Sequence, residues 1–507
     1  MDIKILQGEY WWTGCVNDAH NAPYTVDSVG EFSMYGGKES DQYAPVLVSS
    51  KGRYFWSDKP FTGSVKDGII SLNLLDEGEL GEGYGNLRGA YLAVMKKHFA
   101  FNGKMPDKLF FTAPQYNTWI ELGVEQFQDR IIKYAESIVE NGFTPGVLMI
   151  DGGWQEDYGV YEYCNMRKIP NPKQMVDRLH ELGFKVMVWV SPIVSSAGWR
   201  FKELRKLGYL CKYNGTETPA IRDWWSGDSC MMDLTNPGCV AWFHEKLQSL
   251  IDNYGVDGFK FDAGDGYFYR DDDNIYQPML AREQTKAFNE FGEKYPFNEF
   301  RAAWNCGGMG LVARLHDKYH SWTEYGINTL IPHTVAQGLS GYAYCCPDMV
   351  GGGILDCFVE GSDFEFDQEL FVRWTQASTF TAMMQMSIAP WRVLTKENFE
   401  IVKNCIKLHE EYGETFYKLG VNASKTGEPI VRHMCYEYPD CDFENCSDQF
   451  MLGSDILVAP VLTKGATTRD VRLPQGRWFA DDGTEYEGGQ TVTVDAPLER
   501  LPYFKKI

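Results

Sequence analysis

The chain has 507 residues, of which 44% are hydrophobic and 15% aromatic, and its formal net charge is −22. This length allows two or three domains, and so strong a negative charge excludes nucleic acid as a partner. The 13 cysteines are scattered, and Cys435, Cys441 and Cys446 lack the spacing of a zinc site. We expect reduced thiols and a cytoplasmic protein, because the sequence also shows neither a signal-peptide core nor a membrane-spanning apolar run.

Residues 1–107 predict an N-terminal β-sandwich domain. Glycine and aromatic residues are dense there, and helical periodicity is weak. The segment from Gln42 to Ser50 is typical of a strand, and Lys51-Gly52 then indicates a turn into a second strand that ends at Trp56.

Residues 108–423 alternate between strand and helix patterns, which predicts a (β/α)8 TIM barrel. We expect strands over 109–113, 146–151, 185–191, 256–262, 301–305 and 341–346, and helices over 124–141, 172–182, 239–254 and 328–339. An open doubly wound sheet is the rival, but no Gly-x-Gly-x-x-Gly follows an early strand, which disfavours a dinucleotide fold. Residues 424–507 return to short strands between glycines, for example 455–461 and 491–494, and predict a C-terminal β-domain.

The most informative stretch runs from Val256 to Asp265. Its first half is short, apolar and aromatic, as in a strand buried on both faces. It then breaks into Ala263-Gly264 with a carboxylate on each side. Barrel enzymes carry their catalytic groups at the C-terminal ends of strands, so this stretch is a candidate catalytic site.

Further acids follow other predicted strands, and a barrel would bring all of them to one mouth. Alone, each suits a helix cap or an ion pair. Together they suit glycoside cleavage, which needs two carboxyl groups beside the scissile bond. A divalent metal is an alternative use, but aromatic residues and arginine surround these acids rather than further oxygen ligands, so we expect no metal and no cofactor. The acids are Asp151, Asp262, Asp265, Asp317 and Asp348.

At these residues the chain resembles glycoside hydrolase family 31, the retaining α-glycosidases, over roughly residues 40 to 507. The run Phe259-Lys-Phe-Asp262-Ala-Gly-Asp265 looks like the family's nucleophile strand, which makes Asp262 the nucleophile. Arg301 matches the family's sugar-binding arginine, and Asp317 lies at the family's spacing from it, which implies the acid/base. Trp225 begins a segment that ends in Thr-Asn-Pro, as in the family, and would line the subsite for the cleaved sugar.

The chain also departs from the family pattern. Arg314-Leu315-His316-Asp317 replaces the usual Trp-x-Gly-Asp, so Glu324 is the fallback acid/base. The sugar-binding histidine that many family α-glucosidases carry after the last strand has no counterpart, and Ser387 falls near that position. The variants Phe-Lys-Phe-Asp-Ala-Gly and Pro-Asp-Met-Val-Gly-Gly are closest to the family's α-galactosidase branch.

The resemblance thus implies a retaining, exo-acting α-glycoside hydrolase, first of all an α-galactosidase. An α-glucosidase and a catalytically inactive sugar-binding barrel are the alternatives. The implied partner is an oligosaccharide or glycoside, with neither nucleic acid nor membrane, and a homo-oligomer is allowed. Lys260 could equally bind a sugar hydroxyl or form an ion pair with a neighbouring acid. Any single tryptophan could pack in the core or stack on a sugar. The expected substrate-binding residues are Asp151, Trp119, Trp189, Trp225, Lys260, Asp265, Arg301 and Asp348.

Overall fold

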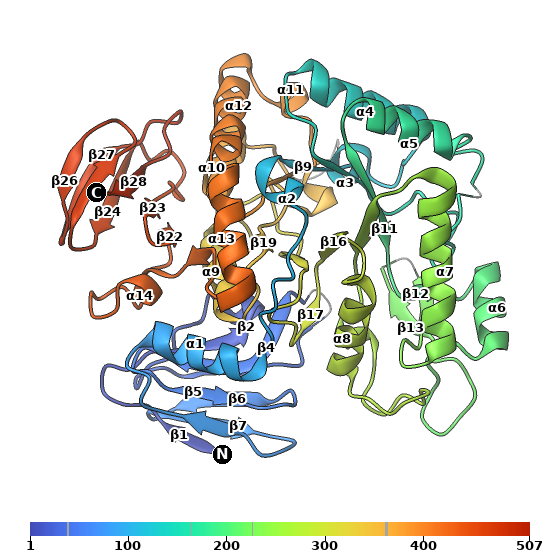
Figure 1. The fold of residues 1–507 in the computed structure, drawn as a ribbon, viewed down its shortest axis with the longest axis horizontal. Coiled ribbons are helices and arrows are strands. Elements are labelled where there is room, and N and C mark those ends of the chain that lie inside the picture. The colour runs from blue at the N-terminus through green and yellow to red at the C-terminus, as the bar shows by residue number, and fades with distance from the viewer. Residues whose placement is uncertain (38–39, 164, 226, 360–363) are drawn as a thin grey trace.

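The computed structural model describes residues 1–37, 40–163, 165–225, 227–359 and 364–507, so Cys164 lies outside the described residues. Figure 1 shows a barrel with the N-terminal strands in blue on one side and the C-terminal strands in red on another. This arrangement confirms the predicted fold class. Within the described part of the chain, no helix is both long and apolar enough to span a membrane.

The N-terminal region consists of two sheets that share one apolar core. The first sheet has the order β1 (Asp2–Lys4), β7 (Ile69–Asn73), β6 (Thr62–Lys66), β3 (Gly30–Ser33). The second has the order β17 (Ala303–Trp304), β4 (Gln42–Ser49), β5 (Tyr54–Trp56), β8 (Glu79–Gly81), and β2 (Trp11–Cys15) also pairs with β4. Trp11, Phe32, Phe55 and Phe61 lie between the sheets, which makes this region a β-sandwich.

Eight parallel strands form the barrel, and the first seven pair consecutively along the chain. The last strand pairs with the first. The seventh and eighth strands do not pair directly, but Val350, which follows the seventh, donates its N–H to the carbonyl of Gln385 in the eighth at 2.8 Å. The strands are β9 (Gln115–Asn117), β10 (Val147–Ile150), β11 (Lys185–Val190), β15 (Gly258–Phe261), β16 (Phe297–Phe300), β18 (Val312–Arg314), β19 (Cys345–Cys346) and β20 (Gln385–Met386).

Helices cover the outside of the barrel (Figure 1). The longer ones in the barrel region are α4 (Gln128–Glu140), α5 (Pro172–Glu181), α7 (Pro237–Tyr254), α8 (Ala281–Gly292), α9 (Leu330–Leu339), α10 (Gln368–Thr379), α12 (Lys396–Glu411) and α13 (Gly413–Thr426). The others are α1 (Leu87–His98), α2 (Leu109–Thr112), α3 (Trp119–Leu122), α6 (Trp199–Leu207), α11 (Pro390–Val393) and α14 (Met434–Glu437), with one-turn helices at Val16–Asp18, Gly266–Phe268, Ile327–Thr329 and Leu355–Cys357. A small sheet of β12 (Ile193–Ser195), β14 (Gly227–Met231) and β13 (Arg222–Trp224) follows β11.

Local sequence signals set the approach to the central strand. Asn236 caps α7 by accepting from the N–H of Gly238, with Pro237 as the first helical residue. Gly255 ends the helix in the left-handed region at φ 83°. Gly258 then opens β15, where a Cβ would lie 2.0 Å from the carbonyl oxygen of Phe297. A side chain there would push β15 away from β16.

The first predicted barrel strand is wrong. Residues 109–112 form helix α2, which begins where Asp107 accepts from the N–H of Leu109 at 2.8 Å. Phe110 and Phe111 pack in an apolar cluster, and the barrel strand is instead the polar β9 that follows. Its Asn117 is fully buried and donates to Gln385 at 3.3 Å. The first strand is polar because it borders a polar layer inside the barrel, so hydrophobicity pointed to the wrong segment.

The strand expected at 301–305 is also displaced. The barrel strand β16 ends at Phe300, and Arg301 follows it. The chain then adds β17 to the N-terminal sandwich, parallel to β4, and no helix lies between β16 and β18 in the residues described. Through β17, the segment that follows Arg301 therefore connects the N-terminal sandwich to the barrel.

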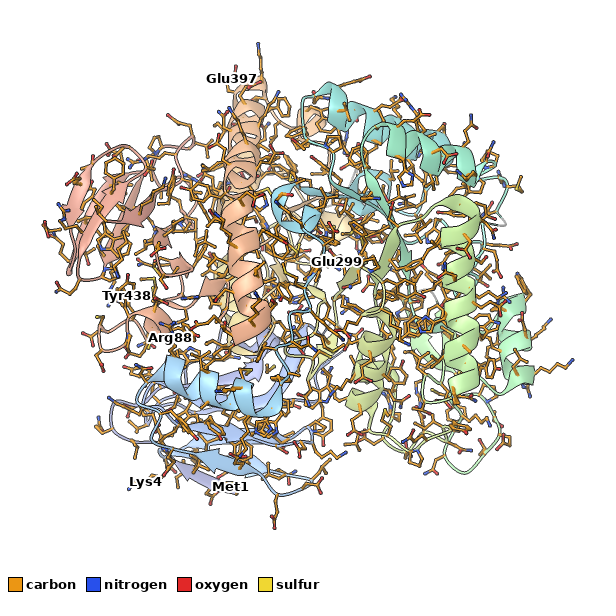
Figure 2. The ribbon with its side chains drawn as sticks, viewed as in Figure 1. Met1, Lys4, Arg88, Glu299, Glu397 and Tyr438 are labelled. Atoms are coloured by element: carbon orange, nitrogen blue, oxygen red, sulfur yellow. The ribbon has the colours of Figure 1, made fainter. Side chains whose placement is uncertain are left out.

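A charged layer lies inside the barrel beneath the strand ends. Glu299 on β16 is fully buried, and Figure 2 shows it among the barrel strands. Its Oε2 accepts from Gln385 at 2.6 Å and its Oε1 lies 3.4 Å from Nε of Arg314. Burial raises the pKa of Glu299 despite this arginine.

The C-terminal strands form two sheets against the barrel and α1. The larger has the order β21 (Val431–Arg432), β22 (Phe450–Leu452), β23 (Ile456–Val458), β28 (Tyr503–Lys506), β25 (Arg477–Ala480), β26 (Glu485–Glu487), and the smaller pairs β24 (Thr468–Leu473) with β27 (Gln490–Asp495). Arg88 on α1 (Figure 2) bonds Glu428 at 2.6 Å. The residue predicted to start this domain, Ser424, falls within α13.

Candidate active site

A cavity of about 520 Å³ opens where the barrel strands end. Residues that follow β9, β10, β15, β16 and β18 contribute to its wall, so segments far apart in the chain meet there. This is the C-terminal end of the barrel, where barrel enzymes carry their active sites, and the volume suits a small ligand. The lining residues are Trp119, Asp151, Gly152, Tyr158, Trp189, Trp225, Lys260, Asp262, Arg301, His316, Asp317, Gly353, Ile354, Leu355 and Asp356.

Asp262 directly follows β15 and is held by several donors. Its Oδ1 accepts from Nε of Arg301 at 2.9 Å and from the N–H of Ala263 at 2.7 Å. Its Oδ2 accepts from Nε1 of Trp189 at 3.0 Å and lies 3.9 Å from Nζ of Lys260. Burial alone would raise the pKa of Asp262, but the positive charges of Arg301 and Lys260 outweigh it and hold this pKa well below the ordinary 3.8. Asp262 is therefore ionised.

The backbone after Asp262 is turned toward its own carboxylate. Ala263 adopts φ 54°, in the left-handed region that residues with a Cβ seldom occupy. This conformation lets the Ala263 N–H donate back to Asp262. Strained backbone of this kind gathers at functional sites, and here it helps to fix the carboxylate.

Asp151 and Lys260 form a buried ion pair beside Asp262. Nζ of Lys260 lies 2.6 Å from Oδ2 of Asp151, and the two side chains are 4% and 5% exposed. Burial alone would lower the pKa of Lys260, but the Asp151 charge raises it. The structure therefore shows the ion-pair role of Lys260, and the same side chain also lines the cavity.

Asp317 shares one cation with Asp348. Nη1 of Arg314 donates to Oδ1 of Asp317 at 2.8 Å and to Oδ1 of Asp348 at 3.1 Å. Asp348 is fully buried, whereas the Asp317 side chain is 34% exposed. Burial, followed by the charge of Asp317, raises the pKa of Asp348 to about 7. The protonation state of Asp348 therefore depends on the charge that Asp317 carries.

Two expected substrate-binding residues lie behind the cavity wall rather than in it. Asp265 is fully buried and bonds both terminal nitrogens of Arg301, at 3.0 and 2.7 Å. Asp348 accepts from Arg314 and from the N–H of Lys318 at 2.6 Å. Because their oxygens are taken by these donors, we correct the expectation for both residues. They position the side chains that do line the cavity.

Aromatic rings enclose the cavity on several sides. Trp189 is 3% exposed and Trp225 is 50% exposed, so one lies deep and the other at the mouth. Trp119 donates through Nε1 to the carbonyl of Gly353 at 2.9 Å, which joins two segments of the wall. Tyr158 packs edge-on against Trp189, with ring centroids 5.5 Å apart. Flat apolar faces of this kind suit the C–H surfaces of a sugar.

Three residues that line the cavity with polar side chains were not predicted from the sequence: Tyr158, His316 and Asp356. His316 precedes Asp317, so adjacency could have indicated it, whereas Tyr158 and Asp356 follow no strand closely enough to carry a signal. The fallback acid Glu324 is exposed and is absent from the lining among the described residues. Ser387 is buried behind the wall, where its Oγ accepts from the N–H of Ile120 at 2.8 Å and so positions the helix of Trp119.

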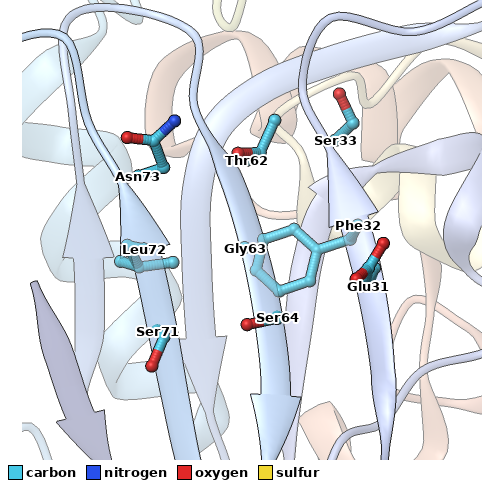
Figure 3. Close-up of a pocket in the computed structure, with 9 residues that line it drawn as sticks. All are labelled: Glu31, Phe32, Ser33, Thr62, Gly63, Ser64, Ser71, Leu72 and Asn73. Atoms are coloured by element: carbon cyan, nitrogen blue, oxygen red, sulfur yellow. The ribbon is translucent and has the colours of Figure 1, made fainter.

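A second hollow, of about 670 Å³, lies on the outer face of the N-terminal sandwich. Figure 3 shows its floor, formed by side chains of β3, β6 and β7. Among the described residues that line it, Glu31 is the only ionisable one. A lone carboxylate cannot supply both an acid and a base, so the barrel cavity is the candidate active site.

Comparison with known proteins identifies the family of the chain. The chain matches the glycosyl hydrolases family 31 TIM-barrel domain over residues 119–419 and the family's C-terminal domain over residues 427–506. It is 29% identical over 420 residues to the myogenesis-regulating glycosidase of Mus musculus, covering 81% of this chain and 58% of that protein. It is 27% identical over 447 residues to alpha-glucosidase 2 of Bacillus thermoamyloliquefaciens, covering 82% and 54%.

The chain therefore spans little more than half the length of these two curated relatives. Its fold matches that of a dextranase from Flavobacterium johnsoniae in complex with glucose, with a TM-score of 0.85 at 22% identity, over 100% of this chain and 66% of that one. Because the barrel-domain match alone covers more than half of its residues, the chain belongs to glycosyl hydrolase family 31.

Proposed function

We propose that the chain is a retaining, exo-acting α-glycoside hydrolase whose substrate ends in an α-galactoside. The observation that carries this proposal is the setting of Asp262, an ionised carboxylate between Arg301, Trp189 and Lys260 in a cavity that it shares with Asp317. Double displacement needs such a nucleophile and a second carboxyl group beside it. The cavity walls suit one terminal sugar, in keeping with exo action.

In the first step, Asp262 attacks the anomeric carbon and the bond from that carbon to the leaving oxygen breaks. Asp317 gives its proton to the leaving oxygen, and a β-linked glycosyl-enzyme results. In the second step, Asp317 takes a proton from water, the water oxygen attacks the anomeric carbon, and Asp262 leaves. Two inversions at that carbon restore the α configuration.

The surrounding side chains prepare both aspartates for these roles. Arg301 and Lys260 keep Asp262 charged, as a nucleophile requires. Arg314 holds Asp317 in place, and burial together with the charge of Asp317 raises the pKa of Asp348 to about 7, so Asp348 can carry a proton near neutral pH. Asp151 and Lys260 bind hydroxyl groups, and the tryptophans shape the pocket.

The choice of galactose rests on the sequence variants around Asp262 and Asp348, since the mouse relative is named a glycosidase without a sugar. An α-glucosidase is the second candidate, favoured by the similarity to alpha-glucosidase 2. Hydrolysis of p-nitrophenyl α-galactoside compared with the α-glucoside distinguishes them. Turnover of neither compound, nor of natural oligosaccharides, would indicate an inactive sugar-binding barrel.

Asp262→Ala tests the assignment of the nucleophile. We expect loss of turnover with an unchanged melting temperature, and undiminished hydrolysis would refute the assignment. Proton NMR of the first product anomer tests retention, for which the α anomer must appear first. We also propose a cytoplasmic location, which the free thiols of the described cysteines support.

A further inference from the structure

His316 lies in the cavity wall, and its ring is held from behind by an acid of the N-terminal sandwich. Asp41, which precedes β4, is fully buried. Its Oδ2 lies 2.7 Å from Nδ1 of His316, and its Oδ1 accepts from the backbone N–H of the same histidine. The two contacts clamp both the ring and the main chain of His316, so the imidazole has a defined orientation.

This clamp also decides which ring nitrogen carries the proton. Burial alone would raise the pKa of Asp41, but His316 and then Lys318 outweigh it, so the pKa is lowered and the carboxylate stays ionised. An ionised carboxylate only accepts hydrogen bonds, so Nδ1 of His316 must donate. Nε2 is then the ring atom left for a ligand. In the neutral ring it carries the lone pair.

The nearby groups do not form a cation site. Asp41, His316 and His333 each place one possible metal ligand within 4.8 Å of the others. However, the buried Nζ of Lys318 lies 3.0 Å from Nδ1 of His333 and occupies that ligand atom. A metal ion would have to displace an amine that faces both Asp41 and Asp348. The cluster is therefore a hydrogen-bond network that supports His316.

The position of His316 indicates which part of a sugar it faces. Its neighbour in the chain is Asp317, the proposed acid/base. On its other side, Ser40, which adjoins Asp41, accepts through its carbonyl from Nη1 of Arg301 at 3.1 Å, and Arg301 bonds Asp262. His316 thus lines the same cavity as Asp262 and lies one residue from Asp317 in the chain. In the proposed mechanism the two aspartates flank the anomeric carbon, and the hydroxyl-bearing neighbour of that carbon is C2, so a polar group of this wall can reach the 2-hydroxyl.

We propose that Nε2 of His316 binds the 2-hydroxyl of the sugar that is cleaved and that Asp41 positions the imidazole for this contact. The proposal rests on the proposed function, because it places the anomeric carbon between Asp262 and Asp317. Contacts with the 2-hydroxyl strengthen in the transition state of glycoside cleavage. His316 therefore contributes more to kcat than to KM.

The test compares p-nitrophenyl α-galactoside with its 2-deoxy analogue, or the α-glucoside pair if glucose is the sugar. We expect His316→Phe to lower kcat/KM about 100-fold on the hydroxylated substrate and less than about threefold on the 2-deoxy substrate. His316→Gln, whose amide reaches the position of Nε2, should recover most of the loss. An equal loss on both substrates, or no loss on either, would overturn the proposal.

Two further measurements separate this contact from a structural role. His180→Gln is the matched control, since His180 lies 2.7 Å from Asp257 just before β15, at the opposite end of the barrel, and its kcat/KM should be unchanged. Asp41→Asn must turn its amide N–H toward Nδ1, which moves the ring proton to Nε2. We expect it to lower kcat/KM about tenfold on the hydroxylated substrate only.

Sugar binding provides a readout that does not require turnover. In calorimetric titrations, galactose or glucose should bind the unmodified protein more tightly than the corresponding 2-deoxy sugar, and His316→Phe should remove that difference. If the protein hydrolyses nothing but this difference is present, the proposed function fails and the His316 contact stands. Equal binding of both sugars by the unmodified protein would contradict the contact itself.

Discussion

Nε of Arg301 lies 2.9 Å from Oδ1 of Asp262, while its two terminal nitrogens bond the two oxygens of Asp265 at 3.0 and 2.7 Å. One guanidinium thus ties a cavity-facing carboxylate to a fully buried one. Asp265 also accepts from the backbone N–H and hydroxyl of Ser40, at 2.9 and 2.8 Å. The position of the proposed nucleophile therefore depends on a segment that leads into the N-terminal sandwich.

Asp265→Ala should reduce both stability and kcat. It leaves the buried guanidinium of Arg301 with one carboxylate fewer, and the loss of a buried charge partner costs about 3–5 kcal/mol of unfolding free energy. Urea unfolding measures this cost, and kcat measures how far Asp262 moves. Asp177→Ala, which breaks a half-exposed pair with Lys173, is the control and should cost less than about 1 kcal/mol. Equal unfolding midpoints for the two variants would contradict the role of Asp265.

Lys260→Met should move the acidic limb of the kcat/KM profile to higher pH. The nucleophile works only when ionised, and Lys260 is one of the charges that lower the pKa of Asp262. Its removal raises that pKa, so activity is lost at a higher pH as the solution is acidified. Lys185→Met is the control, since Lys185 pairs with Asp257 at the start of β11. An acidic limb that stays in place would show that Lys260 does not act on Asp262.

Asp348→Asn should make the stability of the fold less dependent on pH near neutrality. Burial and the charge of Asp317 favour the protonated form of Asp348 in the fold. The pKa of Asp348 is raised from 3.8 to about 7 in the fold. The protonated form of Asp348 therefore stabilises the fold. This contribution is complete below pH 3.8, the pKa of Asp348 in the unfolded chain, and is lost as the pH rises through about 7.

Melting temperatures between pH 5 and pH 9 check the same assignment. Because an asparagine side chain cannot ionise, the Asp348→Asn variant should lose less stability across neutral pH than the unmodified protein does. If the melting temperatures of the two proteins changed in parallel with pH, Asp348 would not have a raised pKa in the fold.

Trp225→Ala should raise KM with little effect on stability. The Trp225 side chain is half exposed at the cavity mouth and lies over Trp224, with ring centroids 3.8 Å apart. Loss of one stacking face costs about 0.5–1.5 kcal/mol of binding, or roughly a two- to tenfold rise in KM. Trp199→Ala removes a ring of similar exposure on α6 and should leave KM unchanged. If both substitutions change KM alike, Trp225 is not a subsite residue.

Features that depend on the sequence of a single strand could be predicted. The strand Gly258–Phe261 is buried throughout and apolar except for Lys260, and Asp262 follows at the strand end, where a barrel places its active site. The same logic located Asp151, whereas Asp317 was identified by its spacing from Arg301 in the family pattern. It failed for Leu109–Ala113, because the real first strand faces a polar interior and carries Gln115 and Asn117 instead of apolar residues.

Strand-end position does not say which way an acid points. Asp265 and Asp348 follow strands as Asp262 and Asp317 do, yet they turn to Arg301 and Arg314 behind the wall. A buried charge takes the nearest opposite charge, and that partner comes from another strand. The roles of these four aspartates therefore separate only once the strands are assembled.

By itself, the amino-acid sequence determined the barrel class, the central strand and the end of the barrel that bears the acids, because strand patterns and strand ends are local properties. Only the tertiary structure decided what holds those acids and what else enters the cavity. Ser40 meets Asp265 across 225 positions, and Asp41 meets His316 across 275. Contacts at such separations are set by how the sandwich packs on the barrel, and no pattern within either segment encodes them.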